Sequence, residues 1–499
     1  MVLLDPSTPE QIERTRCLAA ELPLDLVTPV GGARALRAAG RRVALLESAG
    51  GPSQLLRWSF LACDPDGELT VTDRDSELVL PSYARKAPVA PVHGSATLGL
   101  LRQAQRATAL PRVGSELPPF RGGWVGFLGH ELISELEPRV PLPDADPTGA
   151  PRARFSHFRH VVAFDHAGQR LFLLATCPGG AADRDRALEA LHDLALDLTA
   201  NRGQALPDEP FELLDDEPQG ATSPERFEAG VRRLKREIGQ GEIFQAVLSQ
   251  RFSQGYRGDA FAVYRTLRRT NPAPHLFFYE GEFGTLLGSS PERLCSLGDR
   301  RAETLPIAGT RPRGADADED RSLARELLAD PKERAEHDML VDLARNDLAR
   351  VSCYGSIRVA EHAVPRVFPR VQHLVSRVTG ELRAGHDACD LLAACFPAGT
   401  VSGAPKVRAL QLIAELEDAR RGAYAGAFGY LDDAGDLDVA ITLRSIYADG
   451  ERLHVQAGAG VVFDSDPVRE REETQHKASA VLEAIRAAGR LSRPTEVLA

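Results

Sequence analysis

The chain has 499 residues, of which 43% are hydrophobic and 26% charged, and it carries a formal net charge of −11 at pH 7. This size and composition are typical of a globular protein with two domains or one large one, and the negative charge argues against general nucleic-acid binding or attraction to anionic membranes. The seven cysteines form no CxxC pair and no apolar run is long enough to cross a membrane, so we expect a cytoplasmic protein without a disulfide framework or structural zinc.

The first 200 residues are predicted to form an N-terminal domain of strands and helices. A polar helical lead-in is expected over residues 1–20, an amphipathic helix over 183–200, and strands near 42–47, 57–62, 68–71, 161–164 and 170–174. The glycine-rich run 122–129 lacks the spacing of a dinucleotide or phosphate loop, which favours close backbone packing at a bend. An acidic, proline-containing segment over 201–221 is interpreted as a linker.

A second domain is predicted over residues 222–490. Its expected helices cover 223–240, 259–269 and about 318–347, and its expected strands cover 246–252, 371–376, 439–447 and a hairpin of 275–279 with 285–289. Strands and helices come in blocks rather than in strict βαβ alternation. This order indicates an α+β fold with mainly antiparallel sheets.

The stretch 453–485 combines features of a catalytic site. A strand over 453–456 is expected to turn through Gly458-Ala459-Gly460, where small residues let backbone N–H groups approach an anion. On the following helix Glu470, Glu473 and Lys477 lie at i, i+3 and i+7, so two carboxylates and an ammonium share one side. Such a pattern alone is typical of a solvated, salt-bridged face. The scarcity of lysine, with five in the chain, and the neighbouring glycines favour a metal site beside an anion site.

Seven motifs occur in order between residues 305 and 477: LPIAGTRPRG (305–314), AEHDMLVDLARNDLARV (335–351), VQHLVS (371–376), FPAGTVSGAPKVRA (396–409), AYAGAFGYL (423–431), AITLRS (440–445) and VQAGAGVVFDSDP…EET…K (455–477). From about residue 225 to 487 the chain thereby resembles the chorismate-utilising enzymes, and within them component I of anthranilate synthase. The N-terminal half is similar to that family's amino-terminal domain only through DLVTPV (25–30), ALLES (44–48) and RWSF (57–60).

The resemblance implies two sheets that enclose helices, an interleaved N-terminal regulatory domain, and a site in a cleft between the sheets. Magnesium would be bound by Glu336 and Glu473, with Glu333 and Glu470 close by. Chorismate would be bound through its two carboxylates and its ring by Gly309, Thr310, Thr400, Tyr424, Arg444, Gly458, Ala459, Gly460 and Lys477. Arginine suits this task because its guanidinium binds a carboxylate through two hydrogen bonds.

The activity implied is the conversion of chorismate and ammonia to anthranilate and pyruvate through aminodeoxyisochorismate, the first committed step of tryptophan biosynthesis. Glu292 in the SPE motif would protonate the leaving hydroxyl, since burial raises the pKa of a carboxyl. His373 would assist pyruvate elimination, with Thr310 and Lys477 beside the reacting groups. A single histidine in a strand is more often a packing residue, and only its place in the motif favours catalysis. No glutaminase module is evident, so ammonia is expected from a separate glutamine amidotransferase subunit in a hetero-oligomer.

Two positions distinguish this chain from relatives of other activity. Enzymes that add water to chorismate carry lysine where Gln245 stands, and glutamine cannot act as a base. Aminodeoxychorismate synthases typically carry lysine where Ala308 stands, and alanine cannot attack the ring. The alternatives left open are an aminodeoxychorismate synthase component that lacks this lysine, and a catalytically silent chorismate- or tryptophan-binding regulator.

Feedback inhibition by tryptophan is a further expectation of the resemblance. Ser48, Pro274, His275 and Leu276 match the family's effector pocket, although relatives usually have Tyr-Met where His275-Leu276 stand. Leu45 and Leu46 are equally explained by a core strand that ends in a turn.

Overall fold

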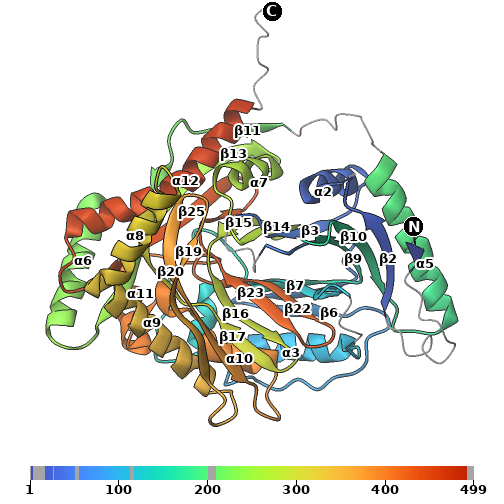
Figure 1. The fold of residues 1–499 in the computed structure, drawn as a ribbon, viewed down its shortest axis with the longest axis horizontal. Coiled ribbons are helices and arrows are strands. Elements are labelled where there is room, and N and C mark those ends of the chain that lie inside the picture. The colour runs from blue at the N-terminus through green and yellow to red at the C-terminus, as the bar shows by residue number, and fades with distance from the viewer. Residues whose placement is uncertain are drawn as a thin grey trace, which may run out of the picture.

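The structure is a computed structural model that describes residues 2–3, 17–25, 27–50, 56–112, 117–200 and 210–491. Within these ranges the strands form two antiparallel sheets of 14 and 11 strands, with helices on their outer faces (Figure 1). The predicted α+β class with two mainly antiparallel sheets is thereby confirmed. The expected layer of helices between the sheets is wrong where the two sheets face each other, because strand and loop side chains of both sheets fill that space. No helix in the described ranges is long and apolar enough to cross a membrane.

The first sheet contains strands from both halves of the chain. In spatial order it consists of β1 (Val2–Leu3), β2 (Cys17–Pro23), β10 (Arg170–Thr176), β9 (His160–Asp165), β4 (Trp58–Cys63), β3 (Val43–Glu47), β14 (His275–Gly281), β15 (Gly284–Ser290), β24 (Ser445–Ala448), β25 (Arg452–Val461), β13 (Gln245–Gly258) and β11 (Phe211–Leu213), with β12 (Gln219–Gly220) and β21 (Gly403–Ala404) paired to β13. One face packs against α2 (Pro29–Ala38), α5 (Ala181–Ala200), α7 (Phe261–Thr270) and α12 (Pro467–Leu491), and α6 (Pro224–Gly239) lies next to α12.

The second sheet also joins the two halves. Its order is β18 (Ile307–Pro312), β20 (Val371–Glu381), β17 (Arg301–Thr304), β16 (Arg293–Gly298), β23 (Leu437–Ile441), β22 (Ala427–Asp432), β7 (Gly123–Leu128), β8 (Ala153–Phe158), β5 (Gly67–Val71) and β6 (Ser76–Val79), with β19 (Arg358–Val367) paired to β20. The helices α3 (Ala96–Thr108), α8 (Ala317–Ala329), α9 (Pro331–Ala349) and α10 (Ala388–Cys395) contact this sheet, whereas α11 (Lys406–Leu416) packs against β13 and β21 of the first sheet. Short 3₁₀ turns cover His130–Leu132, which leads into α4 (Ile133–Leu136), and Gly399–Val401.

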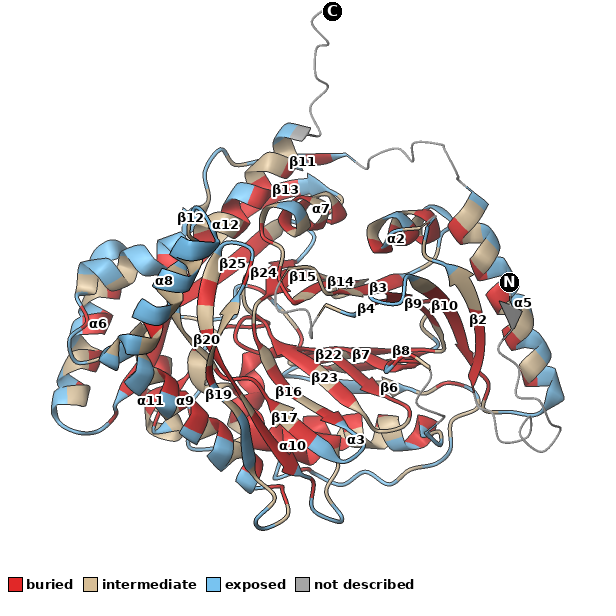
Figure 2. Ribbon diagram, in the orientation of Figure 1, coloured by how far each residue is buried: buried red, intermediate tan, exposed pale blue. Residues whose placement is uncertain are grey.

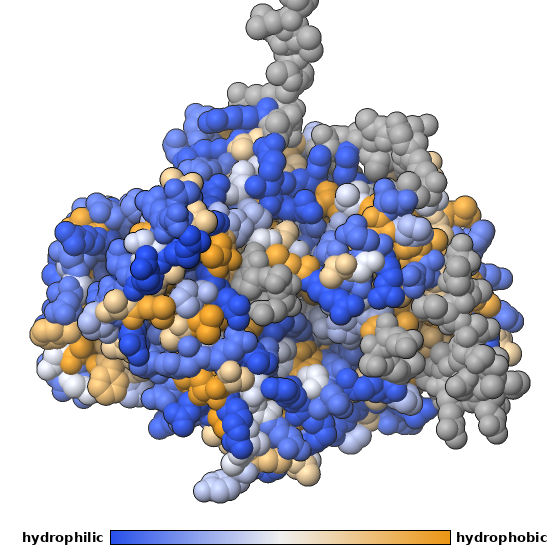
Figure 3. Space-filling view, viewed as in Figure 1, coloured by the Kyte–Doolittle hydropathy of each residue, from blue (hydrophilic) through white to orange (hydrophobic). Residues whose placement is uncertain are grey.

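An aromatic core lies where the two sheets face each other. Phe277 of β14 stacks on Phe428 of β22 with ring centroids 4.4 Å apart, and both rings are buried. Strands here are covered on both faces, which explains why β3 is an almost continuous apolar run, VALLE, rather than an alternating one. Figure 2 shows this pattern: the strands are mostly buried, whereas the helices expose their outer faces. The surface in Figure 3 is mostly hydrophilic, with apolar side chains in small scattered patches.

Both sheets contain strands from before and after the predicted domain boundary at residues 201–221. β3 pairs with β14, and β7 pairs with β22, so residues of the N-terminal half complete sheets of the C-terminal half. Residues 201–209 of the predicted linker lie outside the described residues, whereas β11 and β12 pair with β13 and belong to the first sheet. The helical lead-in predicted over residues 1–20 is wrong at residues 2–3 and 17–20, which belong to strands β1 and β2, and its other residues lie outside the described ranges. Residues 17–20 are buried on both faces of the sheet, since Leu18 and Ala20 pack in one core and Cys17 and Ala19 in another.

Three local predictions are also wrong. The run 122–129 is mostly strand β7 rather than a bend, although the predicted close backbone packing is confirmed, since a Cβ on Gly126 would lie 2.0 Å from the carbonyl oxygen of Arg154. The helix predicted over 318–347 is two helices, because Asp330 caps α9 and Pro331 begins it. The strand predicted over 439–447 is split between the sheets, with β23 in one and β24 in the other.

Candidate active site

A cavity of about 540 Å³ lies among β13, β25, α9, α12, the start of β18 and the 3₁₀ turn at Gly399–Val401. Predicted site residues that line it are Glu292, Glu336, Thr400, Tyr424, Arg444, Gly458, Gly460, Glu470, Glu473 and Lys477. Gln245 and Ala308, the two positions that distinguish related activities, line it as well. Residues up to about 230 positions apart in sequence are thus brought together by the two sheets and the helices α9 and α12.

Glu292 is a buried carboxyl at one side of this cavity. Only 9% of the residue is exposed, and Thr400 Oγ1 donates to its carboxylate oxygens at 3.1 and 3.2 Å. Burial raises the pKa of Glu292 to about 8, although the Thr400 hydrogen bond opposes the shift. Near neutral pH this carboxyl carries a proton that it can donate, which is the property required of a general acid.

Acidic side chains gather on α9 and α12 at another side of the cavity. Burial raises the pKa of Glu336, and the neighbouring carboxylates of Glu333 and Glu473 add to the shift; burial and Glu473 likewise raise the pKa of Glu470. Lys477 Nζ lies 2.7 Å from Glu473 Oε1 and donates to the carbonyl oxygen of Gly458 at 3.1 Å.

These carboxylates are suited to bind a cation, but in their present positions they do not form a complete metal site. Within the described ranges no three or more His, Cys, Asp or Glu side chains are close enough together to bind a metal ion. Glu333 is drawn away from the cavity, because Arg311 Nη1 pairs with its Oε1 at 3.2 Å. The repulsion between Glu336, Glu470 and Glu473 would be relieved by a divalent cation, and carboxylate oxygens are the ligands that Mg²⁺ prefers.

Arg444 and Tyr424 offer polar groups for an anion. Arg444 lies between β23 and β24 with a left-handed backbone, φ 47°, rather than in a strand. Burial lowers the pKa of its guanidinium, and no described residue forms a salt bridge with it. The hydroxyl of Tyr424 lies against β25, 2.9 Å from where a Cβ of Gly458 would be, and burial raises the pKa of Tyr424 to about 12. Tyr424 therefore remains a neutral donor.

The predicted glycine turn at Gly458-Ala459-Gly460 is wrong. These residues continue strand β25, and their partners on β13 are Ser249, Leu248 and Val247. The missing side chains of Gly458 and Gly460 leave room for Tyr424 and Gln245 on this face of the strand, since the Gln245 amide nitrogen is 2.7 Å from where a Cβ of Gly460 would be. Ala459 is fully buried and does not line the cavity.

His373 lies beside Gly309 and Thr310, outside the lining of the cavity. Its Nδ1 is 2.9 Å from the carbonyl oxygen of Gly309 and 3.1 Å from Thr310 Oγ1. A carbonyl oxygen only accepts, so Nδ1 carries the proton in this contact and Nε2 is left with a free lone pair. Burial lowers the pKa of His373, which keeps the ring neutral and able to accept a proton.

Two cations of the cavity were missed by sequence reasoning. Lys332, in the first turn of α9, and Arg469, in the first turn of α12, both line the cavity. A signal for Lys332 exists, because it is one of few lysines and precedes Glu336 by one helical turn. Arginine is so common in this chain that the sequence contains no signal for a role of Arg469.

The residues predicted to bind tryptophan lie together on a different part of the first sheet. Ser48 follows β3, Pro274 precedes β14, and in the register of these strands Leu276 is opposite Glu47. His275 is partly buried, its Nε2 is buried without a hydrogen-bond partner among the described residues, and desolvation lowers the pKa of His275 to about 4. The structure thus brings these four residues together and leaves a polar atom beside them without a partner.

Comparison with known proteins identifies the family. Residues 44–483 match the family model of chorismate binding enzymes. The chain is 41% identical to anthranilate synthase component 1 of Synechocystis sp., with 93% of this chain and 94% of the relative covered, and 41% identical to that of Mycobacterium tuberculosis, with 94% and 92% covered.

Solved structures agree with this result. The crystal structure of anthranilate synthase component I from Streptococcus pneumoniae is 37% identical, with a TM-score of 0.73 over 85% of this chain and 92% of that one. The menaquinone-specific isochorismate synthase of Escherichia coli, at 20% identity and a TM-score of 0.67 over 94% of each chain, shares the fold. The chain therefore belongs to the anthranilate synthase component 1 family of chorismate-binding enzymes.

Proposed function

We propose that the chain converts chorismate and ammonia to anthranilate and pyruvate as an oxo-acid lyase. The observation that carries this proposal is a buried, protonated Glu292 at one side of a cavity whose other sides present Arg444, Lys477 and a group of carboxylates. Chorismate is a dianion with a ring hydroxyl to expel, so it requires cationic groups for its carboxylates and an acid for its leaving group. The cavity supplies both.

The first step adds ammonia to the ring carbon next to the carboxylate-bearing carbon. A C–N bond forms there, the two ring double bonds each shift by one position, and the bond to the hydroxyl across the ring breaks. Glu292 gives its proton so that the hydroxyl leaves as water. The surplus proton of the added ammonia can return to Glu292, which restores the acid. Thr400 orients the carboxyl for this transfer through its hydrogen bond.

The second step makes the product aromatic. The hydrogen on the carbon that bears the new amino group leaves as a proton, the bond from the neighbouring ring carbon to the enolpyruvyl oxygen breaks, and the enolpyruvyl methylene gains a proton to give pyruvate. Nε2 of His373 is the acceptor for the ring proton, because Gly309 fixes the tautomer in which this nitrogen is free. Since His373 lies outside the cavity lining, this role requires the segment around Gly309 to approach the substrate.

Gln245 and Ala308 favour ammonia as nucleophile and elimination as outcome. Both side chains line the cavity, and neither can act as a base or a covalent nucleophile. The alternative of an aminodeoxychorismate synthase is not favoured, since the similar proteins that span nearly the whole chain are named anthranilate synthase component 1.

Mg²⁺ is the proposed cofactor. Glu336 and Glu473 would bind it, with Glu470 beside them in the cavity lining, whereas Glu333 would contribute only after leaving its ion pair with Arg311. The ion would supply positive charge for the ring carboxylate of chorismate. Binding would require Glu473 to exchange its pairing with Lys477, and Lys477 would then be free to contact the substrate.

A glutamine amidotransferase subunit is the proposed source of ammonia, because component 1 of the relatives' name implies a second component. We also propose that tryptophan, the end product of the pathway, binds at Ser48, Pro274, His275 and Leu276 and inhibits the enzyme. The buried, unpartnered Nε2 of His275 is consistent with a ligand that supplies its hydrogen-bond partner.

The test uses the purified chain alone with chorismate, Mg²⁺ and an ammonium salt at alkaline pH. We expect anthranilate fluorescence and pyruvate to appear together, chelation of Mg²⁺ to abolish both, and tryptophan to inhibit. Chorismate consumption without pyruvate would instead identify an aminodeoxychorismate product. No consumption, with or without an added amidotransferase subunit, would refute the proposed activity.

A further inference from the structure

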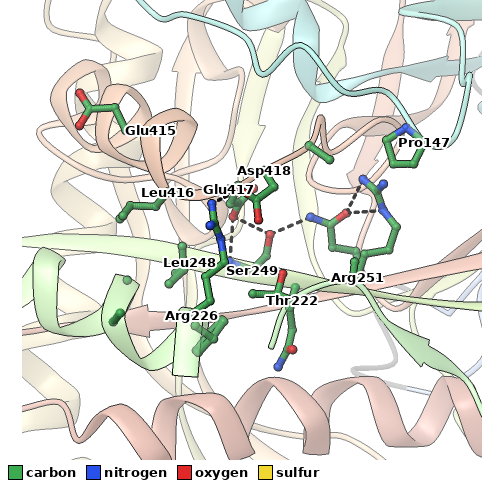
Figure 4. A pocket seen from close by; sticks show the side chains of 17 residues that line it. Pro147, Thr222, Arg226, Leu248, Ser249, Arg251, Glu415, Leu416, Glu417 and Asp418 are labelled. Atoms are coloured by element: carbon green, nitrogen blue, oxygen red, sulfur yellow. Dashed lines mark hydrogen bonds and ion pairs between the residues drawn. The ribbon is translucent and has the colours of Figure 1, made fainter. Parts of the chain in front are cut away.

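A chain of buried hydrogen bonds lies beside the cavity, between strands β13 and β25 and the segment 417–424. Arg251 Nε and Nη2 donate to Gln456 Oε1 at 3.3 and 3.2 Å, and Gln456 Nε2 donates to Ser249 Oγ at 2.8 Å. Ser249 in turn donates from its backbone N–H and its hydroxyl to Glu417 Oε1, at 2.8 and 2.7 Å. Figure 4 shows Ser249 and Glu417 facing one another beside a smaller pocket of about 240 Å³.

This chain ends in a buried ion pair. Arg421 Nε and Nη2 donate to the two carboxylate oxygens of Glu417 at 2.8 and 2.7 Å. The exposed fractions of the two side chains are 2% for Arg421 and 7% for Glu417. Because desolvation offsets most of the attraction in a buried pair, and apolar residues of similar volume often replace one without loss of stability, the pair calls for an explanation beyond stability.

The remaining donors of Arg421 go to the cavity's own backbone. Its Nη1 donates to the carbonyl oxygen of Val401 and its Nη2 to that of Val247, each at 2.7 Å. Its Cζ lies 5.7 Å from the ring centroid of Tyr424. Val247, Val401 and Tyr424 all line the catalytic cavity, whereas Arg421 does not. One guanidinium therefore links the Val247 and Val401 segments of the cavity to its own segment, which carries Tyr424.

We propose that Arg421, oriented by Glu417, is a positioning residue that fixes the Val401 carbonyl and thereby keeps the Thr400 hydroxyl on Glu292. Thr400 is adjacent to Val401 in the short 3₁₀ turn at Gly399–Val401, so displacement of one peptide moves the next. This inference rests on the proposed function, because it gives Arg421 its effect through the acid of that reaction.

Lysine cannot replace Arg421 in this arrangement. The guanidinium is planar and directs Nε, Nη1 and Nη2 along fixed directions, here to one carboxylate and two carbonyl oxygens on different segments. An ammonium on a flexible stem has three donors on a single atom, which cannot lie within hydrogen-bond distance of acceptors spread in this way. Arg421→Lys would therefore retain the positive charge but lose the arrangement of hydrogen bonds.

The test compares Arg421→Lys with Arg251→Lys. Arg251 is similarly buried and belongs to the same hydrogen-bonded chain, but it has no bond to Val401. We expect Arg421→Lys to lower kcat for anthranilate formation by about 10- to 100-fold with the KM for chorismate changed by less than about threefold, as for a displaced catalytic group. Arg251→Lys should keep kcat within about threefold, although both variants lower the melting temperature.

A double-mutant cycle identifies the route of the effect. Thr400→Val removes the hydroxyl that contacts Glu292, so Arg421→Lys in that background should lower kcat by no more than about threefold further. Additive losses, a change confined to KM, or an equal loss in Arg251→Lys would overturn the proposal. If Arg421→Lys does not fold, Glu417→Gln, which retains the guanidinium and weakens its orientation, should lower kcat in the same sense.

Hydrogen exchange separates this inference from the proposed function. Peptides that cover residues 397–404 should exchange faster in Arg421→Lys than in Arg251→Lys, whether or not the wild-type chain makes anthranilate. Unchanged exchange at this segment would refute the positioning role even if the enzyme is active. A wild-type chain without activity would refute the proposed reaction and leave the exchange result to decide the structural part.

Discussion

At the scale of single residues, the burial of Glu292 sets a pH dependence. Its pKa is raised to about 8 by burial, so the acid is protonated below that pH and loses its proton above it. The rate of anthranilate formation at saturating free ammonia should therefore fall as the pH rises through about 8. Glu292→Gln cannot donate this proton and should lower kcat by about 10²- to 10⁴-fold.

The measurement is kcat between pH 6 and 10, with ammonia expressed as its free base so that titration of ammonium does not enter. Glu280→Gln provides the control, since Glu280 is also largely buried but pairs with Arg37 outside the cavity. Its profile should match that of the wild type. A wild-type rate that stays level up to pH 10 would exclude Glu292 as the acid with a pKa near 8.

Most residues of the cavity could be predicted because they belong to motifs, whereas their contacts could not. Glu292 and Thr400 are 108 positions apart, and no local pattern indicates that one hydroxyl donates to the other. The ion pair of Arg311 with Glu333 could not be predicted either, because it depends on how β18 packs against α9. Arg421 was missed for the same reason: its role follows from three acceptors on separate segments.

At the scale of single elements, β25 is a strand whose glycines make space for the cavity. A Cβ on Gly458 would lie 2.9 Å from both the Tyr424 hydroxyl and Val247 Cγ1. Gly458→Ala should therefore push Tyr424 out of place and raise the KM for chorismate by about tenfold, or ~1.4 kcal/mol. Gly298→Ala, at the end of β16 with open space around it, should leave KM unchanged. Equal KM values in steady-state assays of both variants would contradict the close packing of Tyr424 on β25.

Helices and strands were predicted well where one periodic pattern persists, and poorly where the chain changes sheets. The hairpin of β14 and β15 is confirmed, because both strands alternate around a short glycine-containing turn. The break between β23 and β24 was not foreseen, since the apolar pattern of 439–447 continues through Arg444 while the backbone reverses into the other sheet. Asp330-Pro331 did contain the signal for a helix start that separates α8 from α9.

At the scale of the whole molecule, the two halves of the chain form one structure through shared sheets. Composition and a linker-like segment suggested two domains, but strand order depends on tertiary pairing that the sequence pattern does not encode. β3 has β4 on one side and β14 on the other, and β7 lies between β8 and β22. Unfolding of either half would expose the edges of both sheets, so we expect the halves to unfold together.

His157 offers a probe of this joint unfolding, because it links the halves inside the second sheet. Its Nδ1 is 2.6 Å from Asp66 Oδ1, and its Nε2 is 3.1 Å from Asp433 Oδ1 in the C-terminal half. Burial opposes the imidazolium charge, but the carboxylates of Asp433 and Asp66 prevail and raise the pKa of His157 to about 9. The stabilisation is complete below the unfolded-state pKa of about 6.5 and is lost as the pH rises through about 9.

The free energy of unfolding, measured by urea titration at pH 6 and at pH 9.5, should therefore fall more in the wild type than in His157→Gln. Between these two pH values, the fall in the free energy of unfolding should be larger in the wild type than in the variant by on the order of 3 kcal/mol. Other buried acids titrate over this range in both proteins, so only the difference reports on His157. His362→Gln, which removes an exposed histidine paired with Asp338, should show the same fall in the free energy of unfolding as the wild type. Two separate urea transitions, with only one of them affected by His157→Gln, would show that the halves unfold independently.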